Sequence, residues 1–350
     1  MYKSLFKLNP VKRALNQLIS IDFGSSNTVL FDIERGVFWE EPSVLVIDGA
    51  ANSARALAVG HEASAMVDRT TGGLQVVYPV QDGVIVDLDR AELLLKHLLQ
   101  RIAHRNLFSY YEAVVALPPG STEVERRALR DTVLGAGARH VHLVDKAVAA
   151  AFGSGLSVSS PIGSMVVDVG AGTTIAAIVN AGGAAHSAFV RVGGNRMDQA
   201  IIAEIKRTYA VLIGEPTAER VKRTIGAAMM EDQDDDPSAL VRGRSLITGM
   251  PVEIMIKRSD IVRALSEPLS IICDTVFSAI REAKPELVAD VMDSGIILTG
   301  GASLLLHFGQ YLSQMVGLPV FLGEQPTRAV ALGAGRHWQD APATLSYAGY

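Results

Sequence analysis

The stretch that decides the fold is VVDVGAGTT, Val166 to Thr174, in which an apolar run ends in an aspartate and Gly, Ala and Thr follow. A similar stretch, SIDFGSSNT, lies upstream at Ser20 to Thr28. The two aspartates are 146 residues apart, about the length of one domain. Each stretch opens a series of short strand patterns that continues into helices. We therefore expect an internal duplication of an α/β domain.

The composition of this repeated turn suits phosphate binding. Glycine lets successive backbone N–H groups approach a phosphate, and hydroxyl side chains add donors. An aspartate at the strand end is expected to hold a hydrated Mg²⁺ or to orient a water molecule. One such turn alone is also typical of a plain β-hairpin. Two copies at equivalent places favour a pair of turns that grip one polyphosphate.

A third stretch, IILTGGASLL at 296–305, combines a buried strand pattern, two glycines and a helix start that we place at Leu304. Such an arrangement lets a ligand lie against the backbone. In isolation it is equally compatible with a generic strand-to-helix turn. Together with the two hairpins it predicts a third part of a nucleotide site.

The bulk composition excludes several classes of protein. With 350 residues, 49% of them hydrophobic, the chain can bury the cores of two domains. The net charge of -5 and the lack of a basic stripe with interleaved aromatics give no reason to expect a nucleic-acid partner. Cys273 is the single cysteine, which excludes a disulfide framework and a Cys-rich metal site and favours a reducing, cytoplasmic compartment.

The sequence predicts no membrane span, and its first residues are compatible with contact with a membrane surface. It has no uninterrupted apolar run of about 18 residues. The segment MYKSLFKL, Met1 to Leu8, mixes apolar side chains with two lysines and can lie in a lipid interface. The alternative is a frayed terminus.

Helical patterns and their boundaries can be assigned along the chain. Thr122 and Glu125 form a T-x-x-E capping box that begins a helix ending near residue 134. A further helical region begins at Ser259, and we expect Pro268 to interrupt it. Other helices are predicted over 90–104, 195–209 and 217–230.

Ordered segments from about residue 18 to residue 336 resemble the MreB family of bacterial actin-like proteins of rod-shape determination. The segments are IDFGSSNT, WEEPSVLVI, YPVQDGVIVD, STEVERRAL, GAGARHVHLV, MVVDVGAGTT, VRVGGNRMDQAI, LIGEPTAERVK, VRGRSLITGMP, GIILTGGASLL and VALGAGR.

The resemblance implies an α/β protein with the actin-like ATPase fold: two RNase H-like domains, each with a smaller subdomain, and a nucleotide in the interdomain cleft. Domain I would comprise 1–147 plus 325–350, with its small subdomain at about 38–77. Domain II would comprise 148–324, with its small subdomain at about 182–245.

The resemblance also implies ATP and Mg²⁺ as cofactors and assembly into filaments of double protofilaments. These filaments would lie on the inner face of the cytoplasmic membrane, where cell-elongation membrane proteins are expected as partners. Met1 to Leu8 and the apolar stretch LFSYY, Leu107 to Tyr111, would contact the lipid.

Site residues follow by position in the matching motifs. Asp22 and Asp168 resemble the carboxylates that hold Mg²⁺ through water and order the attacking water. For Glu219 and Lys222, an ordinary solvated helix face is the alternative. The remaining nucleotide contacts implied by the resemblance are Ser25, Ser26 and Asn27 in the first phosphate loop, Gly170, Ala171, Gly172 and Thr173 in the second, Glu219, Arg220 and Lys222 near the ribose or base, and Gly300, Gly301, Ala302 and Ser303 near the adenosine.

The chain departs from the family where Glu-Glu-Pro is usual, because it has Asp145, Lys146 and Ala147 there. In the family the second glutamate positions the attacking water, which a lysine cannot do. Asp145 is a doubtful substitute, since neighbouring side chains of a strand point to opposite faces. Ala171 also replaces a usual glycine. We expect a divergent or paralogous member that binds nucleotide but whose ATPase activity is weak, altered or lost.

Three functions are compatible with this pattern. The first is an ATP-binding cytoskeletal filament protein that organises cell shape or cell-wall synthesis. The second is a hydrolysis-deficient, nucleotide-locked scaffold or adaptor. The third, a small-molecule kinase of the same fold, would need a carboxylate base aimed at a bound hydroxyl, and no additional acidic or aromatic insertion supplies one.

Overall fold

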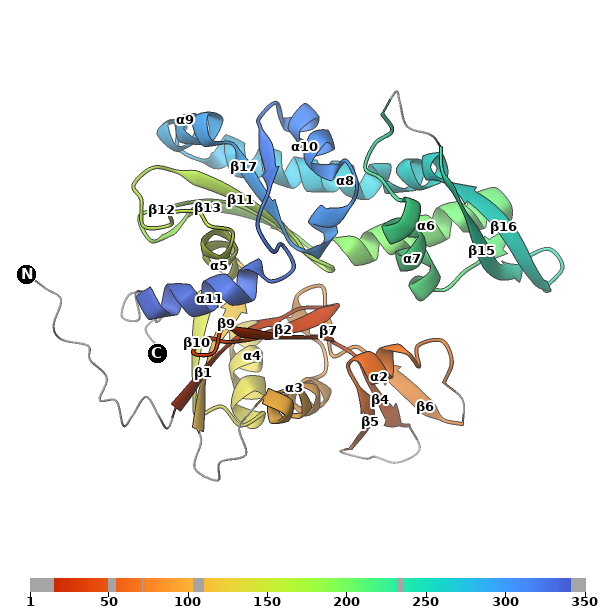
Figure 1. The fold of residues 1–350 in the computed structure, drawn as a ribbon, viewed down its shortest axis with the longest axis horizontal. Coiled ribbons are helices and arrows are strands. Elements are labelled where there is room, and N and C mark those ends of the chain that lie inside the picture. Colours follow the sequence, from red (N-terminus) through yellow and green to blue (C-terminus); the bar gives the residue numbers. More distant parts are fainter. Residues whose placement is uncertain (1–15, 50–54, 71, 103–109, 232–235, 341–350) are drawn as a thin grey trace, which may run out of the picture. The chain divides into compact units, whose positions relative to one another are not determined.

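The chain forms two units (Figure 1). The computed structural model describes residues 16–49, 55–70, 72–102, 110–231 and 236–340. Unit 1 comprises Met1–Gly153 and Val330–Tyr350, and unit 2 comprises Ser154–Ala329. The expected lipid-contacting segment 1–8 lies outside the described residues, as does 107–109 of the second one.

Unit 1 is built on a five-stranded sheet with the order β10-β9-β1-β2-β3. Strand β1 pairs antiparallel with β2 and parallel with β9. The elements of this unit are β1 (Asn16–Phe23), β2 (Asn27–Asp32), β3 (Val37–Pro42), β4 (Leu45–Asp48), β5 (Ala56–Val59), α2 (His61–Ser64), β6 (Leu74–Val77), β7 (Val80–Gln81), β8 (Val84–Ile85), α3 (Leu88–Ile102), β9 (Tyr110–Leu117), α4 (Glu123–Gly135), β10 (His140–Asp145), α5 (Lys146–Gly153) and α11 (Ala329–Asp340).

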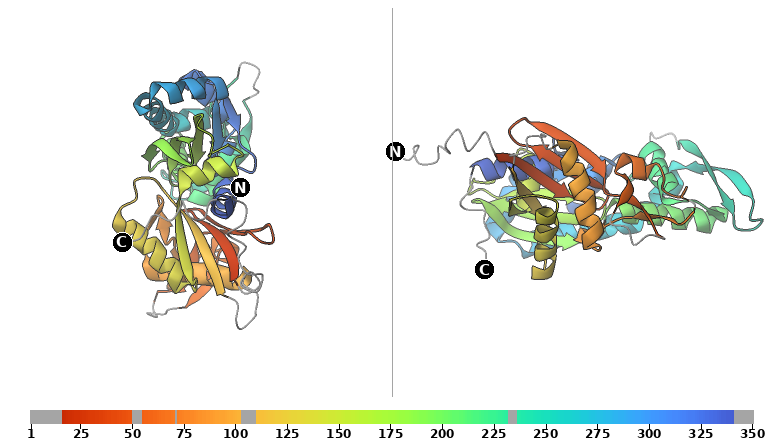
Figure 2. Two further views of the ribbon diagram at one scale, coloured as in Figure 1. Left: turned by 90° about the vertical axis from the view of Figure 1, so that its left-hand side faces the viewer. Right: turned by 90° about the horizontal axis from the view of Figure 1, so that it is seen from below.

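Helices cover both faces of this sheet, which explains why its central strands are almost entirely apolar. Ile19 and Ile21 of β1 share a buried core with residues of α3 and α4. These two helices lie side by side, as the right-hand view of Figure 2 shows. On the opposite face, Val29 and Phe31 of β2 pack against Leu332 of α11. Leu30 of β2 belongs to the first of these cores, so side chains that alternate in direction along β2 belong to different cores.

Unit 2 repeats the architecture, with the sheet order β13-β12-β11-β17-β18. Its core joins β11 and β12 to α6 and α8 through residues such as Val167, Met197 and Ile272. The elements are β11 (Ser164–Val169), β12 (Thr174–Asn180), β13 (Gly183–Val190), α6 (Gly194–Tyr209), β14 (Val211–Leu212), α7 (Glu215–Ile225), β15 (Ser238–Ser245), β16 (Pro251–Lys257), α8 (Arg258–Glu282), α9 (Pro285–Ser294), β17 (Ile296–Thr299), the 3₁₀ helix η1 (Gly301–Leu304), α10 (Phe308–Val316) and β18 (Val320–Leu322).

The two units have the same connectivity. In each one, the first three strands form an antiparallel meander, a later strand pairs in parallel with the first of them, and a further strand pairs in parallel with that later strand. The register agrees as well: Asp22 lies opposite Val29, and Asp168 lies opposite Ile175, seven residues further along in both cases. The duplication expected from the two turns is thus present in the pairing of the strands.

Each unit also carries a small three-stranded sheet after its meander. In unit 1 it has the order β5-β4-β6, and in unit 2 it has the order β14-β15-β16. The second small sheet spans Val211–Lys257, later than the expected region of about 182–245. The difference arises because β13 pairs with β12 and so belongs to the large sheet.

Some of the expected helix boundaries lie within one or two residues of the observed ones, and three expectations are wrong. The capping box of α4 is present, with Thr122 Oγ1 accepting from the Glu125 N–H and Glu125 Oε2 accepting from the Thr122 N–H. Helix α6 begins at Gly194, one residue before the expected start. Helix α7 ends at Ile225 instead of residue 230, α8 continues through Pro268, and α10 begins at Phe308, after η1, instead of at Leu304.

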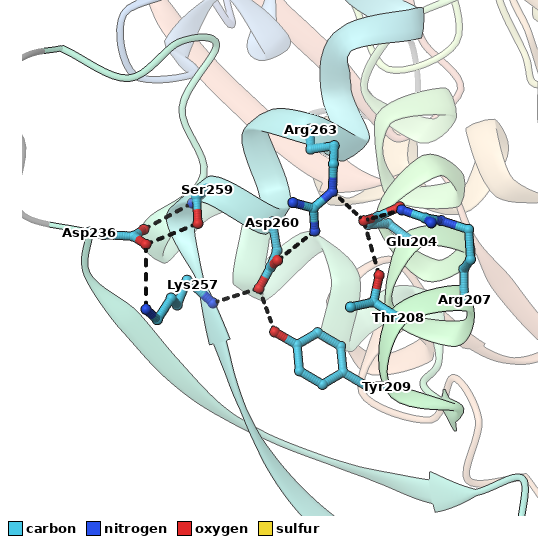
Figure 3. Close-up of polar contacts among 9 residues, drawn as sticks. All are labelled: Glu204, Arg207, Thr208, Tyr209, Asp236, Lys257, Ser259, Asp260 and Arg263. Carbon is cyan, nitrogen blue, oxygen red and sulfur yellow. Dashed lines mark hydrogen bonds and ion pairs between the residues drawn. The ribbon is translucent and has the colours of Figure 1, made fainter.

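In unit 2, a cluster of polar side chains connects α6 to the start of α8 through hydrogen bonds and ion pairs (Figure 3). The guanidinium of Arg263 donates to Glu204 (2.7 Å) and to Asp260 (2.6 Å). Glu204 also accepts from Arg207, and Asp260 accepts from the Tyr209 hydroxyl. The carboxylates are largely buried, so these charge-assisted hydrogen bonds offset their desolvation.

The same cluster extends to the hairpin of β15 and β16. The backbone N–H of Lys257 donates to Asp260, and both the N–H and the hydroxyl of Ser259 donate to Asp236. Asp236 stands just before β15 and Lys257 ends β16. The cluster therefore fixes the base of this hairpin to α8.

Candidate functional site

The first turn lies between β1 and β2, as the sequence predicts. It is closed by a hydrogen bond from the Gly24 N–H to the Asn27 carbonyl (3.1 Å). A Cβ on Gly24 would stand 2.7 Å from that carbonyl oxygen, so only glycine permits this closure. The turn thus presents the backbone of Ser25 and Ser26 at the end of a buried strand.

The residues of the first turn form hydrogen bonds with other parts of unit 1. The Ser25 hydroxyl accepts from the Gly83 N–H (3.0 Å), and the Ser26 carbonyl accepts from the Ser43 N–H (2.7 Å). Asn27 Nδ2 donates to Glu40 at 3.4 Å. A hydroxyl that accepts one bond retains a proton to donate, so Ser25 can still bond a phosphate oxygen. The loop at Gly83 is a neighbour of the site that the sequence reasoning did not include.

Asp22 forms an ion pair with Lys146. Lys146 Nζ lies 3.0 Å from Asp22 Oδ1, and the side chains are only 11% and 16% exposed. The pair joins the end of β1 to the first residue of α5. The substituted position therefore faces one of the two aspartates that the sequence singled out.

Asp145 has a local structural role. Its Oδ1 accepts from the backbone N–H groups of Ala147 (2.7 Å) and Val148 (3.3 Å), which is an N-cap of α5. Burial raises the pKa of Asp145, while these two bonds and the charge of Arg126 lower it. One oxygen of the Asp145 carboxylate is therefore bound to the N-terminus of α5.

The metal expected at Asp22 does not fit the residues around it. Mg²⁺ is bound through carboxylate oxygens and water, whereas Asp22 Oδ1 contacts an ammonium group. A divalent cation there would be repelled by Lys146 and would compete with it for the same oxygen. Within the described residues, no group of three or more His, Cys, Asp or Glu side chains could hold a metal ion.

The second turn, between β11 and β12, has the same closure as the first. The Gly170 N–H donates to the Thr173 carbonyl at 2.8 Å, as Gly24 does to Asn27 in unit 1. Asp168 and Thr173 are buried, and the Thr174 hydroxyl donates to the Val192 carbonyl. The two turns are therefore alike in backbone hydrogen bonding as well as in sequence.

The second turn is anchored to the N-terminus of α6. The N–H groups of Gly194 and Asn195 donate to the carbonyls of Gly170 (3.0 Å) and Ala171 (2.8 Å). A Cβ on Gly193 would stand 2.4 Å from the Gly170 carbonyl oxygen. Gly193 is thus required for the close approach of α6 to the turn, a role that the sequence reasoning did not assign.

The third element, Gly300 to Ser303, packs against the same turn. Gly300 has φ +87°, and a Cβ there would meet the Val169 carbonyl oxygen at 2.3 Å and Asp168 Oδ1 at 2.7 Å. Ser303 Oγ donates to the Gly300 carbonyl. Gly301 has more space, since the nearest atom to a Cβ is 4.0 Å away. Unit 2 therefore brings its second and third predicted elements into contact.

Lys222 reaches this group of residues from α7. Its Nζ donates to the Gly194 carbonyl (2.9 Å) and to Asp198 Oδ2 (2.8 Å). Burial raises the pKa of Asp198 to about 6, and the charge of Lys222 opposes the rise. Asp198 Oδ1 is buried and has no hydrogen-bond partner. Asp198 could not be identified from the sequence, because its partner Lys222 lies 24 residues away.

Glu219 and Arg220 are less closely associated with the turn. Both are exposed, and Glu219 forms an ion pair with Arg223 one helical turn later, at 3.7 Å. For Glu219, the alternative of a solvated helix face matches the observed surroundings. Lys222 is the member of the AERVK stretch that contacts the neighbourhood of the second turn.

Of the residues predicted to contact a membrane, Tyr110 and Tyr111 lie in the part of the chain that the structure describes. Tyr111, the last residue of the expected apolar loop, lies in β9 and is buried in the core of unit 1. It therefore does not belong to an exposed lipid-contacting surface. None of the helices in the described parts of the chain is long and apolar enough to cross a membrane.

Comparison with protein families identifies a match with the MreB/Mbl protein family over residues 16–345. Among curated relatives, the cell shape-determining protein MreB of Escherichia coli (strain K12) is 42% identical over 322 residues, which cover 91% of this chain and 92% of the relative. The cell shape-determining protein Mbl of Bacillus subtilis (strain 168) is 35% identical over 317 residues, covering 91% and 94%.

Solved structures show the same likeness. MreB5 of Spiroplasma citri, in crystal structures bound to AMPPNP and to ADP, matches with a TM-score of 0.87 and 32% identity, over 93% of this chain and 97% of that one. The MamK double helical filament matches with a TM-score of 0.76 at 19% identity, over 93% and 99%. The expected actin-like fold is thereby confirmed.

Proposed function

Because this chain belongs to the MreB/Mbl family of cell shape-determining proteins, we propose that it binds ATP and assembles into filaments that help organise cell shape or cell-wall synthesis. The observation that carries nucleotide binding is the pair of turns closed by equivalent hydrogen bonds, Gly24 to Asn27 and Gly170 to Thr173. In this proposal each turn binds phosphate oxygens of one ATP molecule through backbone N–H groups.

The contacts around the second turn support a place for the nucleoside. Lys222 and the N-terminus of α6 meet beside Ala171, and the Cα of Ala171 lies 3.6 Å from where a Cβ on Gly194 would stand. Gly301 and Ala302 lie in the adjacent 3₁₀ turn. We assign Lys222 to the ribose and Gly300 to Ser303 to the adenosine. The structures of MreB5 bound to AMPPNP and ADP make a nucleotide the natural ligand to test.

Hydrolysis is proposed to be slow. The family resemblance places a water-positioning glutamate where Lys146 stands, and an ammonium group cannot accept a proton from water. Asp145 caps α5 and does not replace it. A nucleotide-locked filament or scaffold is therefore the form of the function that this position favours.

Self-association and membrane attachment complete the proposal. MamK, which shares the fold, forms a double helical filament. We propose that this chain assembles similarly and lies on the inner face of the cytoplasmic membrane, attached through the apolar and basic segment 1–8. Many weak anchors along one polymer would give strong overall binding to lipid.

The test combines assembly and turnover. Pelleting and electron microscopy are carried out with ATP, ADP and AMPPNP, with and without vesicles that contain anionic lipid, and phosphate release is measured in parallel. We expect polymer with ATP and AMPPNP and little phosphate release. Absence of polymer in every nucleotide state would contradict the filament proposal.

A substitution separates binding from turnover. Lys146→Glu restores the carboxylate that the family has, and we expect phosphate release to rise by about a hundredfold or more, the lower end of the usual effect of a general base. Lys96→Glu makes the same charge change at an exposed position of α3 and is the control. Equal phosphate release from the two variants would show that Lys146 does not limit turnover.

A further inference from the structure

The Lys146–Asp22 ion pair is built by the fold, since the residues are 124 positions apart in sequence. Asp22 stands in β1 between the buried residues Ile21 and Phe23. It precedes by two residues Gly24, whose N–H closes the first turn. The ammonium group of Lys146 is therefore held at the strand end that leads directly into the proposed phosphate-binding backbone.

The backbone that carries Lys146 is capped and closely packed. Lys146 is the first residue of α5, and Asp145 caps the helix at that point. The next residues, Ala147 to Ala151, are all buried. Further along, a Cβ on Gly333 of α11 would stand 1.9 Å from the Ala149 carbonyl oxygen, so the two helices are in close contact. Because α5 is held in this way and the side chain of Lys146 is largely buried, the ammonium group of Lys146 remains beside Asp22.

The charges at this position are already balanced. A carboxylate next to a polyphosphate requires a cation, because two like charges at short range repel each other. A bound divalent ion commonly supplies that cation, and a chelator can remove it. Here an ammonium group is attached covalently to the chain and lies 3.0 Å from the carboxylate.

We propose that Lys146 is a tethered cation that takes the place of a divalent metal at Asp22, so that this protein binds nucleotide with little dependence on Mg²⁺. The inference rests on the proposed function, because it concerns the same nucleotide. It goes further by naming the chemical form of the ligand: the metal-free nucleoside polyphosphate is bound about as well as its Mg²⁺ complex. The ammonium group neutralises Asp22 and gives the first turn a positive neighbour.

The test is the dissociation constant of a fluorescent ATP analogue, measured by anisotropy on the full-length protein in Mg²⁺ and in excess EDTA. For the unmodified protein we expect the two constants to agree within about threefold, less than the effect of one charge-assisted hydrogen bond. Binding that is strong in Mg²⁺ but about tenfold or more weaker in EDTA would overturn the inference and leave the proposed function intact. Absence of binding in both conditions would overturn both.

Variants at residue 146 identify the source of the effect. Lys146→Gln removes the charge, and we expect its affinity in EDTA to fall by about tenfold, the value of one hydrogen bond to a charged group. Lys146→Arg keeps a cation and should retain metal-independent binding. Lys96→Gln, an exposed lysine of α3, is the matched control and should behave as the unmodified protein does.

Two outcomes with the variants would also contradict the inference. One is a Lys146→Gln protein that binds in EDTA as well as the unmodified protein. The other is an equal loss in Lys146→Gln and Lys96→Gln. Urea unfolding of each variant shows whether it is folded, and if Lys146→Gln is not, the comparison of Mg²⁺ with EDTA on the unmodified protein and on Lys146→Arg still decides.

Discussion

At the scale of single residues, the two aspartates at equivalent register positions have different neighbours. Lys146 pairs with Asp22, whereas the backbone of Gly300 packs against Asp168. The sequence predicted both turns, because each one is a local pattern of a few residues. It could not predict the ion pair between Lys146 and Asp22 or the one between Lys222 and Asp198, because these contacts depend on how distant segments pack.

Gly300 provides a test of the close packing beside Asp168. Its φ of +87° is accessible to glycine, and a methyl group would collide with the Val169 carbonyl oxygen. We expect Gly300→Ala to lower the free energy of unfolding by about 3 kcal/mol, the upper range for such backbone strain. Urea unfolding measures the change.

Gly301→Ala is the control for this prediction. A Cβ at Gly301 has no neighbour closer than 4.0 Å, so the substitution should change the free energy of unfolding by less than about 0.5 kcal/mol. Equal losses in the two variants would mean that the third element does not pack against the second turn as described.

Asp198 predicts a pH dependence of stability. Burial raises its pKa to about 6, so at lower pH the folded state binds a proton that the unfolded state releases. The group's contribution is therefore greatest in acid and is lost as the pH rises through about 6. Lys222, Glu219 and Glu215 are the charged groups that modify this titration.

The measurement compares Asp198→Asn with the unmodified protein by urea unfolding at about pH 5 and about pH 7. Between these values we expect the unmodified protein to lose about 1 kcal/mol relative to the variant, as the linkage between pKa and stability requires. A difference that is the same at both pH values would contradict the raised pKa.

At the scale of secondary-structure elements, the polar cluster around Arg263 links α6, α8 and the β15–β16 hairpin. Burial alone would raise the pKa of Glu204, but hydrogen bonds from Arg207, Arg263 and Thr208 outweigh it and lower the pKa. The pKa of Asp260 is lowered in the same way, with Tyr209, Lys257 and Arg263 opposing the effect of burial. The cluster therefore stabilises the fold only while both carboxyls are ionised.

Arg263→Ala should lower the free energy of unfolding at neutral pH by about 2–3 kcal/mol, because it leaves two buried carboxylates without their shared partner. The folded-state pKa values are lowered, so this stabilisation is present above the ordinary carboxyl range. It should disappear progressively below about pH 4 as the carboxyls protonate. Urea unfolding across this pH range measures both effects.

Arg242→Ala is the control, since Arg242 pairs with Glu253 on the same hairpin but is 82% exposed. Exposed ion pairs contribute about 0.5 kcal/mol or less. An Arg263→Ala protein as stable as the Arg242→Ala protein would show that the cluster does not hold these elements together.

Local signals predicted most elements, and tertiary contacts explain the errors. The capping box identified the start of α4 because both of its hydrogen bonds are local. Pro268 does not end α8, since Leu265, Leu269 and Ile272 on either side of it are buried in the core of unit 2. Burial of a long apolar face outweighs the loss of one backbone hydrogen bond.

Helix α7 ends early for a reason that is also tertiary. Gly226 leaves the helix in extended conformation, and the next residue, Ala227, forms a parallel bridge with Leu306. The helical periodicity of the sequence continues past this point, but the pairing with a segment 79 residues away determines where the helix stops.

At the scale of the whole molecule, the chain contains one architecture twice, each copy with its own turn. If ATP binds as proposed, both turns should be protected by the same ligand. Hydrogen exchange with mass spectrometry, at a protein concentration below that of assembly, should show slower exchange in peptides that cover Gly24–Thr28 and Gly170–Thr174 when ATP is added.

The turn of the β15–β16 hairpin at residues 246–250 is the internal control, because it lies in the small sheet of unit 2 and, among the described residues, forms no backbone hydrogen bond with the second turn. Its exchange should be unchanged. Protection of only one of the two phosphate-binding turns would contradict the proposal that each contributes to binding.

The division of the chain into units has a consequence for biosynthesis. Unit 2 is one continuous segment, whereas unit 1 needs α11, which the ribosome makes after all of unit 2. Until then, Val29, Phe31 and Ile33 lack the helix that covers them. The ribosome therefore begins unit 1 first and completes it last. Throughout the translation of unit 2, the nascent chain carries an uncovered apolar sheet face, which is the kind of surface that chaperones bind.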